Sequence, residues 1–317
     1  MVSSIGYMVL GFVLLYAGGE GLVRGAGTLA LRIGMSPFIV GLTVVAFATS
    51  APELAVSVQA AMAEADDVAI GNVVGSNIAN IGLVLGICAL IRPIEIHARI
   101  LRLDLPWLIF VSAMLIAFLH DGRISRPAGM VFLVGLAAFL YTNIQLARRD
   151  QEDELVRREF EGAVPVGSRS VALDWLMITV GLVALVLGGA AFVRGGVGLA
   201  TALGVSPALI ALTVIAVGTS LPELATSVVA SLKGDNDIAV GNIVGSNFFN
   251  VLAILGITAT FIPLDRGDIT MVDLTVMLMF AMILVPLILV RNRIGRPEGL
   301  ALLAGYAGYV AWLVRQS

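Results

Sequence analysis

The segment TVIAVGTSLPEL at residues 213–224 repeats TVVAFATSAPEL at residues 43–54, at an offset of 170 residues. Without any gap, 26 of the 51 residues in 36–86 are identical to their counterparts in 206–256. The identical residues include a Thr-Ser-x-Pro-Glu motif, which is rich in oxygen and carries a carboxylate. Such a motif, duplicated inside apolar sequence, predicts an ion site at the interface between two repeats.

The composition predicts an integral membrane protein. Of the 317 residues, 59% are hydrophobic and 13% are charged, and the mean hydropathy is +1.00. A soluble domain carries about 25% charged residues. Long apolar runs favour spanning helices, and the alternating pattern of barrel strands is not visible. The single cysteine, Cys88, excludes an internal disulfide and a site built from several cysteines. We therefore expect an all-α membrane protein without a cofactor.

The hydrophobic pattern predicts ten transmembrane helices, five in each copy. An odd number of spans makes the second copy enter the membrane from the opposite side, so the two five-helix repeats are expected to be inverted. The expected parts are a first repeat at 1–147 with its motif at 36–86, a connector at 148–170, and a second repeat at 171–317 with its motif at 206–256. The expected spans are 5–31, 36–63, 68–91, 99–119, 127–147, 171–203, 206–232, 238–262, 270–290 and 297–315.

Arginine and lysine predict the orientation of the chain. Most of them fall on one side if the polar loop 148–170 is cytoplasmic, and both termini then lie outside. The expected location is the inner (plasma) membrane, crossed many times. Arg24 and Arg194 lie within helices, and we expect them to reach an interface or to pair with loop acids such as Asp67 or Asp237.

Glu53 and Glu223 fall near the middle of their spans. A charged acid at that depth costs about 2.5–3.5 kcal/mol on insertion scales and needs a partner. No arginine or lysine of the repeated motifs lies at the same depth. A bound cation is the natural compensator. The alternative is that both acids are protonated and form hydrogen bonds between helices.

Pro52 and Pro222 are expected to open their helices. A proline lacks the N–H group and clashes with the carbonyl four residues earlier. Carbonyl groups around Ala46–Thr49 and Ala216–Thr219 would then be free to accept a ligand, because irregular backbone at this depth is tolerated where it lines a cavity. A simple kink without a ligand is the alternative.

The second repeated motif supplies further oxygen atoms. Ser76 and Asn80 are four residues apart and share one helix face, and Ser246 and Asn250 repeat that spacing. The GxxxG pattern in the same helices serves close packing, alone or together with ion binding. Carboxylates, hydroxyls, amides and carbonyls are hard donors, which suit Ca²⁺ or Na⁺ better than Zn²⁺ or Cu²⁺.

These motifs resemble the alpha repeats of a known family. GTSLPE at 218–223, ATSAPE at 48–53, and GNxVGSN at 71–77 and 241–247 are similar to those of the Ca²⁺/cation antiporter superfamily. Within it, the chain resembles the Na⁺/Ca²⁺ exchanger branch in its short prokaryotic form. The resemblance implies that spans two, three, seven and eight form a rigid core. Spans one and six are then long and tilted, and they slide across that core.

The resemblance also implies ligands for the transported ions. A central divalent site would use the carboxylates of Glu53 and Glu223 with the backbone carbonyls of Thr49 and Thr219. Flanking Na⁺ sites would use the side chains of Ser50, Ser220, Ser76 and Ser246 with the carbonyls of Ala46 and Ala216. Several relatives carry Asp where this chain has Asn250. Asn at both 80 and 250 argues against K⁺ co-transport.

The expected function is a secondary antiporter that exchanges Na⁺ for Ca²⁺ and exports Ca²⁺. The alternatives are H⁺-coupled exchange of a divalent cation, with both glutamates titrating, and a passive cation channel, which internal inverted symmetry disfavours. No HExxH motif and no Ser/His or paired-Asp constellation indicates an enzyme. The expected partners are the two ions and the lipid bilayer, with no nucleic acid.

Overall fold

The computed structural model of the chain describes residues 2–33, 35–96, 100–150, 170–203, 216–291 and 293–316. The α-helices are α1 (Val2–Ile33), α2 (Pro37–Val40), α3 (Ala46–Thr49), α4 (Ala51–Met62), α5 (Asp66–Ala79), α6 (Gly86–Ile91), α7 (Leu105–His120), α8 (Arg126–Asp150), α10 (Val171–Ala202), α12 (Ala216–Thr219), α13 (Leu221–Lys233), α14 (Asn236–Phe248), α15 (Gly256–Phe261), α16 (Met271–Arg291) and α17 (Arg296–Gln316). The π-helical segments are η1 (Gly41–Val45), η2 (Asn80–Leu85), η3 (Ile100–Asp104) and η5 (Phe249–Leu255). The strands are β1 (Ile94–Glu95), β2 (Arg123–Ile124), β3 (Leu264–Asp265) and β4 (Arg293–Ile294).

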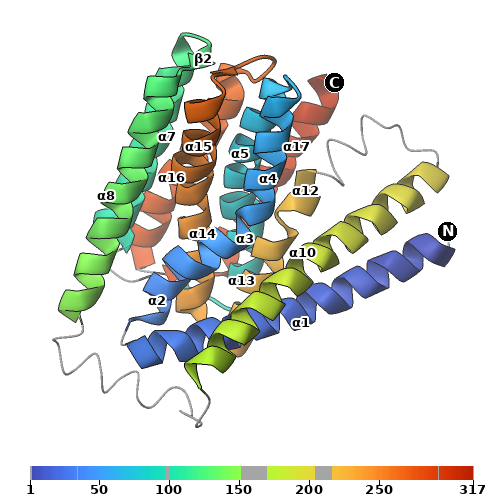
Figure 1. The fold of residues 1–317 in the computed structure, drawn as a ribbon, viewed down its shortest axis with the longest axis vertical. Coiled ribbons are helices and arrows are strands. Elements are labelled where there is room, and N and C mark those ends of the chain that lie inside the picture. Colours follow the sequence, from blue (N-terminus) through green and yellow to red (C-terminus); the bar gives the residue numbers. More distant parts are fainter. Residues whose placement is uncertain are drawn as a thin grey trace.

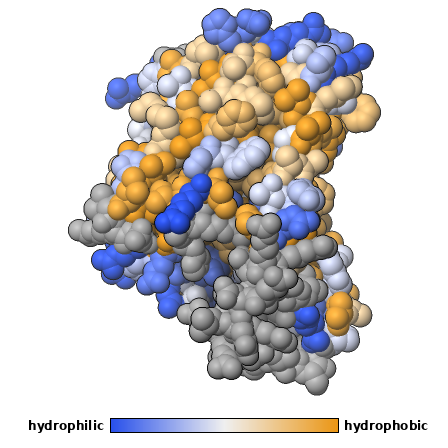
Figure 2. All heavy atoms as spheres, turned by 90° about the vertical axis from the view of Figure 1, so that its left-hand side faces the viewer, coloured by the Kyte–Doolittle hydropathy of each residue, from blue (hydrophilic) through white to orange (hydrophobic). Residues whose placement is uncertain are grey.

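Seven of the described helical segments are long and apolar enough to cross a membrane, and the number rises to eight if one bent pair counts as a single span. Figure 2 shows hydrophobic side chains gathered over one face, with hydrophilic side chains along its upper rim. The prediction of a helical membrane protein is therefore confirmed. The ten expected spans exceed this number. Residues 204–215, which begin the seventh expected span, lie outside the described part, as do residues 151–169 of the connector.

Two long helices, α1 and α10, pack side by side and are strongly inclined to the rest of the bundle (Figure 1). Each has 32 residues, or about 48 Å at 1.5 Å per residue, which exceeds the ~30 Å of a bilayer core. A helix of that length must tilt. Glycine allows the close approach, because a Cβ atom at Gly18 would lie 2.7 Å from the carbonyl oxygen of Gly181. Arg32 and Asp174 join the two helices by an ion pair of 2.6 Å.

The helical segment that carries the GNxVGSN motif of the second repeat lies at the centre of the bundle. The segment Asn236–Phe261, formed by α14, η5 and α15, is buried along its most apolar stretch. It stands among α4, α5 and α16 in Figure 1. A Cβ atom at Gly241 or Gly245 would overlap the backbone carbonyls of Phe38 and Leu42. The glycines of the GxxxG pattern thus let α14 pack directly against α2 and η1.

Short strands link the two halves of the chain at both ends of the bundle. β1 pairs with β4, with Ile94 opposite Ile294, and β2 pairs with β3, with Ile124 opposite Leu264. Adding 170 to the residue numbers of β1 and β2 gives those of β3 and β4. Each strand of the first half therefore pairs with the counterpart of the other strand, which is a reciprocal arrangement.

The two arginines inside the long helices do not pair with the loop acids that the sequence suggested. Arg24 forms an ion pair of 2.5 Å with Glu20, one turn earlier on α1. The guanidinium group of Arg194 lies over the ring of Tyr7, 4.9 Å from its centroid. The acid and the aromatic ring on the same helix pair each offer the cation a local partner.

Candidate cation site

Both repeated Thr-Ser-x-Pro-Glu motifs lie where a helix is interrupted. α3 ends at Thr49 and α4 begins at Ala51, and the two halves of this span are bent by 42°. α12 ends at Thr219 and α13 begins at Leu221. Proline is the second residue of α4 and of α13, where a missing N–H costs nothing. The predicted break at each proline is present, two residues before it.

The serine at each break adopts a conformation between helix and strand. Ser50 has φ −82° and ψ 2°, and Ser220 has φ −89° and ψ 8°. These values lie in the sparsely populated bridge region, where functional residues often sit. Each serine therefore turns the chain between two half-helices and points its hydroxyl away from a regular helical path.

Glu53 and Glu223 are the first acids of the half-helices α4 and α13. Both side chains are buried, each with a relative exposure of 1%. The hydroxyl of Ser50 donates to Glu223 Oε1 at 3.1 Å, and that of Ser220 donates to Glu53 Oε1 at 3.5 Å. Each glutamate is thus held by the serine of the other motif. The positive end of its own half-helix also favours the anion.

The second oxygen of each carboxylate has no partner among the described residues. Glu53 Oε2 and Glu223 Oε2 are fully buried and accept no hydrogen bond, and no described arginine, lysine or histidine forms an ion pair with either acid. An unpaired buried carboxylate oxygen is costly, so native proteins supply a partner. A cation between the two carboxylates would supply one.

The serines of the second motif lie at the same place. The hydroxyls of Ser76 on α5 and Ser220 lie 3.2 Å apart, so Ser76 can donate to Ser220 while Ser220 donates to Glu53. Ser246 on α14 is fully buried, and its hydroxyl has no partner among the described residues. One serine is therefore part of the hydrogen-bonded cluster, and the other offers a free oxygen.

Asn80 and Asn250 lie in π-helical segments, which the sequence did not predict. η2 begins at Asn80, and Asn250 is the second residue of η5. Both amide atoms of Asn80 are buried without a partner in the described structure. Asn250 donates to Asn77 Oδ1 at 3.0 Å, while its own oxygen has no partner there. Segments of π-helix are frequent at functional sites because they shift side chains and free backbone groups.

Thr49, Thr219, Ala46 and Ala216 lie at the two breaks. The carbonyl of Ala46 is not free in this structure, since it accepts from the backbone N–H of Ser50 at 3.0 Å; the hydroxyl oxygen of Thr49 lies 3.3 Å from it. Thr49 is fully buried and Thr219 is partly exposed. Ala216 begins α12.

Four asparagines near the site were missed by the sequence reasoning. Asn72 and Asn242 each form hydrogen bonds with residues at both interrupted helices. Asn77 donates to the carbonyl of Asn247 at 3.4 Å and accepts from Asn250. All four are identical between the repeats, and this identity at a polar position in apolar sequence was the available signal.

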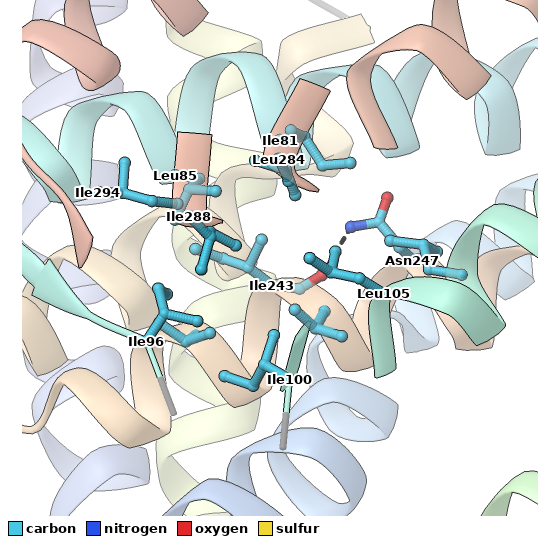
Figure 3. A pocket seen from close by; sticks show the side chains of 13 residues that line it. Ile81, Leu85, Ile96, Ile100, Leu105, Ile243, Asn247, Leu284, Ile288 and Ile294 are labelled. Atoms are coloured by element: carbon cyan, nitrogen blue, oxygen red, sulfur yellow. Dashed lines mark hydrogen bonds between the residues drawn. The ribbon is translucent and has the colours of Figure 1, made fainter. Parts of the chain in front are cut away.

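A small cavity near the site is not a second ion site. It has a volume of ≈ 10 Å³, about the space of one water molecule. Its walls are aliphatic apart from Asn247, whose amide nitrogen is bonded to the carbonyl of Ile243 at 2.7 Å (Figure 3). A lining of isoleucines and leucines cannot coordinate an ion. The oxygen-rich cluster between the two breaks is therefore the candidate site.

The arrangement suits a hard cation. It gathers two carboxylates, several hydroxyls and amide oxygens. Among the described residues, no group of three or more His, Cys, Asp or Glu is placed so that it could hold a metal ion. Oxygen donors of this kind select Ca²⁺ or Na⁺ over thiophilic metals. Two carboxylates would balance the charge of one Ca²⁺.

Comparisons with known proteins point in the same direction. The family described as "Sodium/calcium exchanger protein" matches residues 3–145 and 173–315, two stretches 170 residues apart. The chain is 37% identical to the inner membrane protein YrbG of Escherichia coli K12 over 318 residues, which cover 99% of this chain and 97% of that protein. It is 32% identical to the sodium/calcium exchanger MaX1 of Methanosarcina acetivorans over 342 residues, covering 96% of this chain and 97% of that one.

Solved structures of an exchanger resemble the fold described above. The sodium-calcium exchanger NCX_Mj, in crystals soaked with zero Na⁺ and Ca²⁺, superposes with a TM-score of 0.84 at 31% sequence identity. The match covers 98% of this chain and 99% of that one. The likeness therefore extends over both halves of the chain.

Proposed function

Because this chain belongs to the sodium/calcium exchanger family, we propose that it is a secondary antiporter that exchanges Na⁺ for Ca²⁺ across the membrane by alternating access. The family is one of cation transporters, and an enzymatic activity is not part of the proposal.

One observation carries the proposal. Two buried glutamates, Glu53 and Glu223, each accept from the serine at the break of the other repeat, and each keeps one carboxylate oxygen without a partner among the described residues. Neutral hydrogen-bonding glue would pair both oxygens. A site that releases its ion in every cycle must instead leave oxygens free when it is empty. These free oxygens support cation binding over a purely structural role.

We propose that the ions are held by the full set of repeated oxygen donors. Glu53, Glu223 and the backbone carbonyls of Thr49 and Thr219 would bind Ca²⁺. Na⁺ would use some of the same oxygens, so that one ion displaces the other. The further ligands in this proposal are Ser50, Ser220, Ser76, Ser246, Asn80, Asn250 and the carbonyls of Ala46 and Ala216.

The proposed topology has ten spans in two inverted five-helix repeats, 1–147 and 171–317, joined by a cytoplasmic connector at 148–170. The reciprocal pairing of β1 with β4 and of β2 with β3 supports a two-fold relation between the halves. The crossed bonds from Ser50 to Glu223 and from Ser220 to Glu53 support it too. Inverted repeats allow alternating access, because exchanging their two conformations opens the site to the opposite side.

The proposed location is the inner (plasma) membrane, with both termini outside. The relative YrbG is an inner membrane protein, and the apolar spans of this chain suit a bilayer. With the proposed ten spans, most arginines and lysines would lie on the side of the connector, which supports a cytoplasmic connector. With Na⁺ entering down its gradient, Ca²⁺ would be exported.

Transport in inside-out vesicles tests the proposal. Vesicles loaded with Na⁺ should accumulate Ca²⁺, the uptake should stop when an ionophore dissipates the Na⁺ gradient, and K⁺ should not be needed. A proton gradient alone should give no uptake. The matched control is Glu95→Gln, which removes an exposed carboxylate far from the site and should transport normally. Uptake driven by protons without Na⁺ would replace the proposal with H⁺-coupled exchange, and flux without any gradient would indicate a channel.

A further inference from the structure

We infer that Asn72 and Asn242 are positioning residues of the cation site, each of which holds the threonine of the opposite repeat through its amide oxygen. The inference rests on the proposed function and adds to it two residues that are not ion ligands. It depends on a set of contacts that occurs twice in the structure.

Asn242 joins three elements with one amide group. Its nitrogen donates to the backbone carbonyl of Glu223 at 3.4 Å and to the hydroxyl of Ser227 at 3.0 Å, both on α13. Its oxygen accepts from the hydroxyl of Thr49 at 3.0 Å, on α3. Asn242 itself lies on α14 and is fully buried, as is Thr49. The amide thus ties the interrupted span of one repeat to that of the other.

Asn72 repeats these contacts in the other half. Its nitrogen donates to the carbonyl of Glu53 at 3.1 Å and to the hydroxyl of Ser57 at 3.0 Å. Its oxygen accepts from the hydroxyl of Thr219 at 3.4 Å. Every partner in this set is the counterpart, 170 residues away, of a partner of Asn242. The two repeats share only about half of their motif residues, yet the hydrogen-bond partners of Asn72 and Asn242 correspond one to one. Chance does not explain this correspondence well.

The chemistry of the partners fixes the orientation of the amide. A backbone carbonyl such as that of Glu223 can only accept a hydrogen bond, so the amide atom that faces it must be the nitrogen. The oxygen of Asn242 then faces Thr49, and the threonine hydroxyl must donate. The hydroxyl has a single hydrogen. The carbonyl of Ala46, at 3.3 Å, and the carboxylate of Glu223 are two further acceptors within reach of this hydroxyl, and the contact with Asn242, at 3.0 Å, is shorter than the one with Ala46.

This orientation has a consequence for ion binding. A cation is attracted to lone pairs and repelled by a hydroxyl hydrogen. The amide oxygen of Asn242 accepts the hydrogen bond of the Thr49 hydroxyl. This bond also fixes the position of Thr49, the last residue of α3, whose backbone carbonyl is a proposed ligand. The same amide holds the backbone of Glu223, which carries one of those carboxylates. The distance between ligands from different repeats is therefore set by one side chain.

Equilibrium ion binding to the purified full-length protein tests this role. Calorimetric titration with Ca²⁺, and with Na⁺ as competitor, is compared for the parent, Thr49→Val and Thr49→Ser. Both variants keep the backbone carbonyl, but valine loses the hydroxyl while serine keeps it. We expect valine to weaken Ca²⁺ binding on the order of tenfold, as for loss of one buried hydrogen bond. Serine should bind within about threefold of the parent.

A double-mutant cycle assigns the effect to the asparagine. Because Thr49→Val and Asn242→Ala remove the same bond, the double variant should bind Ca²⁺ at least about fivefold more tightly than the product of the single effects predicts. The pair Thr219→Val and Asn72→Ala should behave alike. Thr142→Val is the control, since that hydroxyl bonds only within α8 and the change should leave affinity unaltered.

The outcomes separate this inference from the proposed function. If the parent binds no Ca²⁺, the proposed function fails. If the parent binds Ca²⁺ and Thr49→Val binds it equally well, or the cycle is additive, Asn242 does not position the site. If Asn242→Ala does not fold, the comparison of Thr49→Val with Thr49→Ser still decides, because loss in both variants would contradict a role for the hydroxyl.

Discussion

At the scale of single residues, the two buried glutamates dominate the energetics. A carboxylate with one unpaired oxygen in a buried place is unfavourable until a cation arrives, so the empty site stores a cost that ion binding relieves. The serine of the opposite repeat donates a hydrogen bond to only one of the two carboxylate oxygens of each glutamate. We therefore expect a bound cation to contact the two oxygens that remain unpaired.

Replacing either acid by its amide should separate stability from binding. In Glu53→Gln or Glu223→Gln, the side chain keeps its size and loses a charge that is unpaired in the empty site. We expect the unfolding temperature without ions to stay the same or to rise. The further rise that Ca²⁺ gives to the parent should vanish, because a ligand stabilises only the state that binds it. Vesicle transport should fall to background. Normal Ca²⁺ exchange by either variant would exclude the proposed site.

Adding a third acid should make the site sensitive to protons. Asn250→Asp places a carboxylate beside Asn77 and, in the proposed site, with the two glutamates, and like charges in a buried site favour protonation of one another. We expect this variant to lose Ca²⁺ transport at a higher pH than the parent. The measurement is Ca²⁺ flux over a pH series, with and without K⁺. Asn236→Asp, which adds an acid at the start of α14, is the control. Superimposable curves for Asn250→Asp and the parent would place residue 250 outside the site.

At the scale of elements, the sequence predicted the breaks better than the helices that complete the site. A proline two residues after Ser50 or Ser220 has a direct steric effect, so the interruptions were foreseeable. The π-helical segments at Asn80 and Asn250 were not, because a shift from i→i+4 to i→i+5 bonding depends on tertiary packing and has no residue pattern of its own. The hydrogen bonds of the Asn242 side-chain amide could not be predicted from the sequence either, because they join three separate elements.

The glycines of α14 should be the least replaceable residues of any helix here. A Cβ atom at Gly245 would overlap the carbonyl of Leu42 and lie 2.6 Å from the Cβ of Ala46. We expect Gly245→Ala to destabilise the protein by about 1–3 kcal/mol, as overpacking does. Gly6→Ala is the control, because a Cβ there meets no described atom within 4 Å. Alanine favours the helix, so this change should be neutral or slightly stabilising. Thermal unfolding of both variants in detergent checks this, and equal stabilities would contradict the close packing.

At the scale of the whole molecule, the two halves are similar but not equivalent. The long helices α1 and α10 cross the bundle together, and only α1 is joined to it by an ion pair among the described residues. Glu20 on α1 lies 3.2 Å from Lys233 at the end of α13. The counterparts of these residues, Ala190 and Ala63, carry no charge. The conformation seen here therefore has an attraction that the opposite arrangement of the repeats would lack.

Removing this ion pair should shift the balance between the two conformations. Under alternating access, α1 moves against α13, and the contact between Glu20 and Lys233 must break in each cycle. A partly exposed pair contributes about 0.2–1 kcal/mol, so Glu20→Gln or Lys233→Met should change the population ratio by roughly 1.4- to 5-fold. The change should appear as an altered ratio of Ca²⁺ exchange rates in the two directions, measured in right-side-out and inside-out vesicles.

The double variant decides whether the two residues act together. If the pair itself biases the equilibrium, Glu20→Gln combined with Lys233→Met should have the effect of one change rather than of two. Arg24 also forms an ion pair with Glu20, so Arg24→Gln serves as a control. It removes a positive charge that lies beside Glu20 and leaves α13 unchanged. It should leave the ratio of rates closer to the parent's than Lys233→Met does, because Arg24 moves with α1. Additive effects, or an unchanged ratio in all three variants, would mean that the energy difference between the conformations arises elsewhere in the contact between α1 and the bundle.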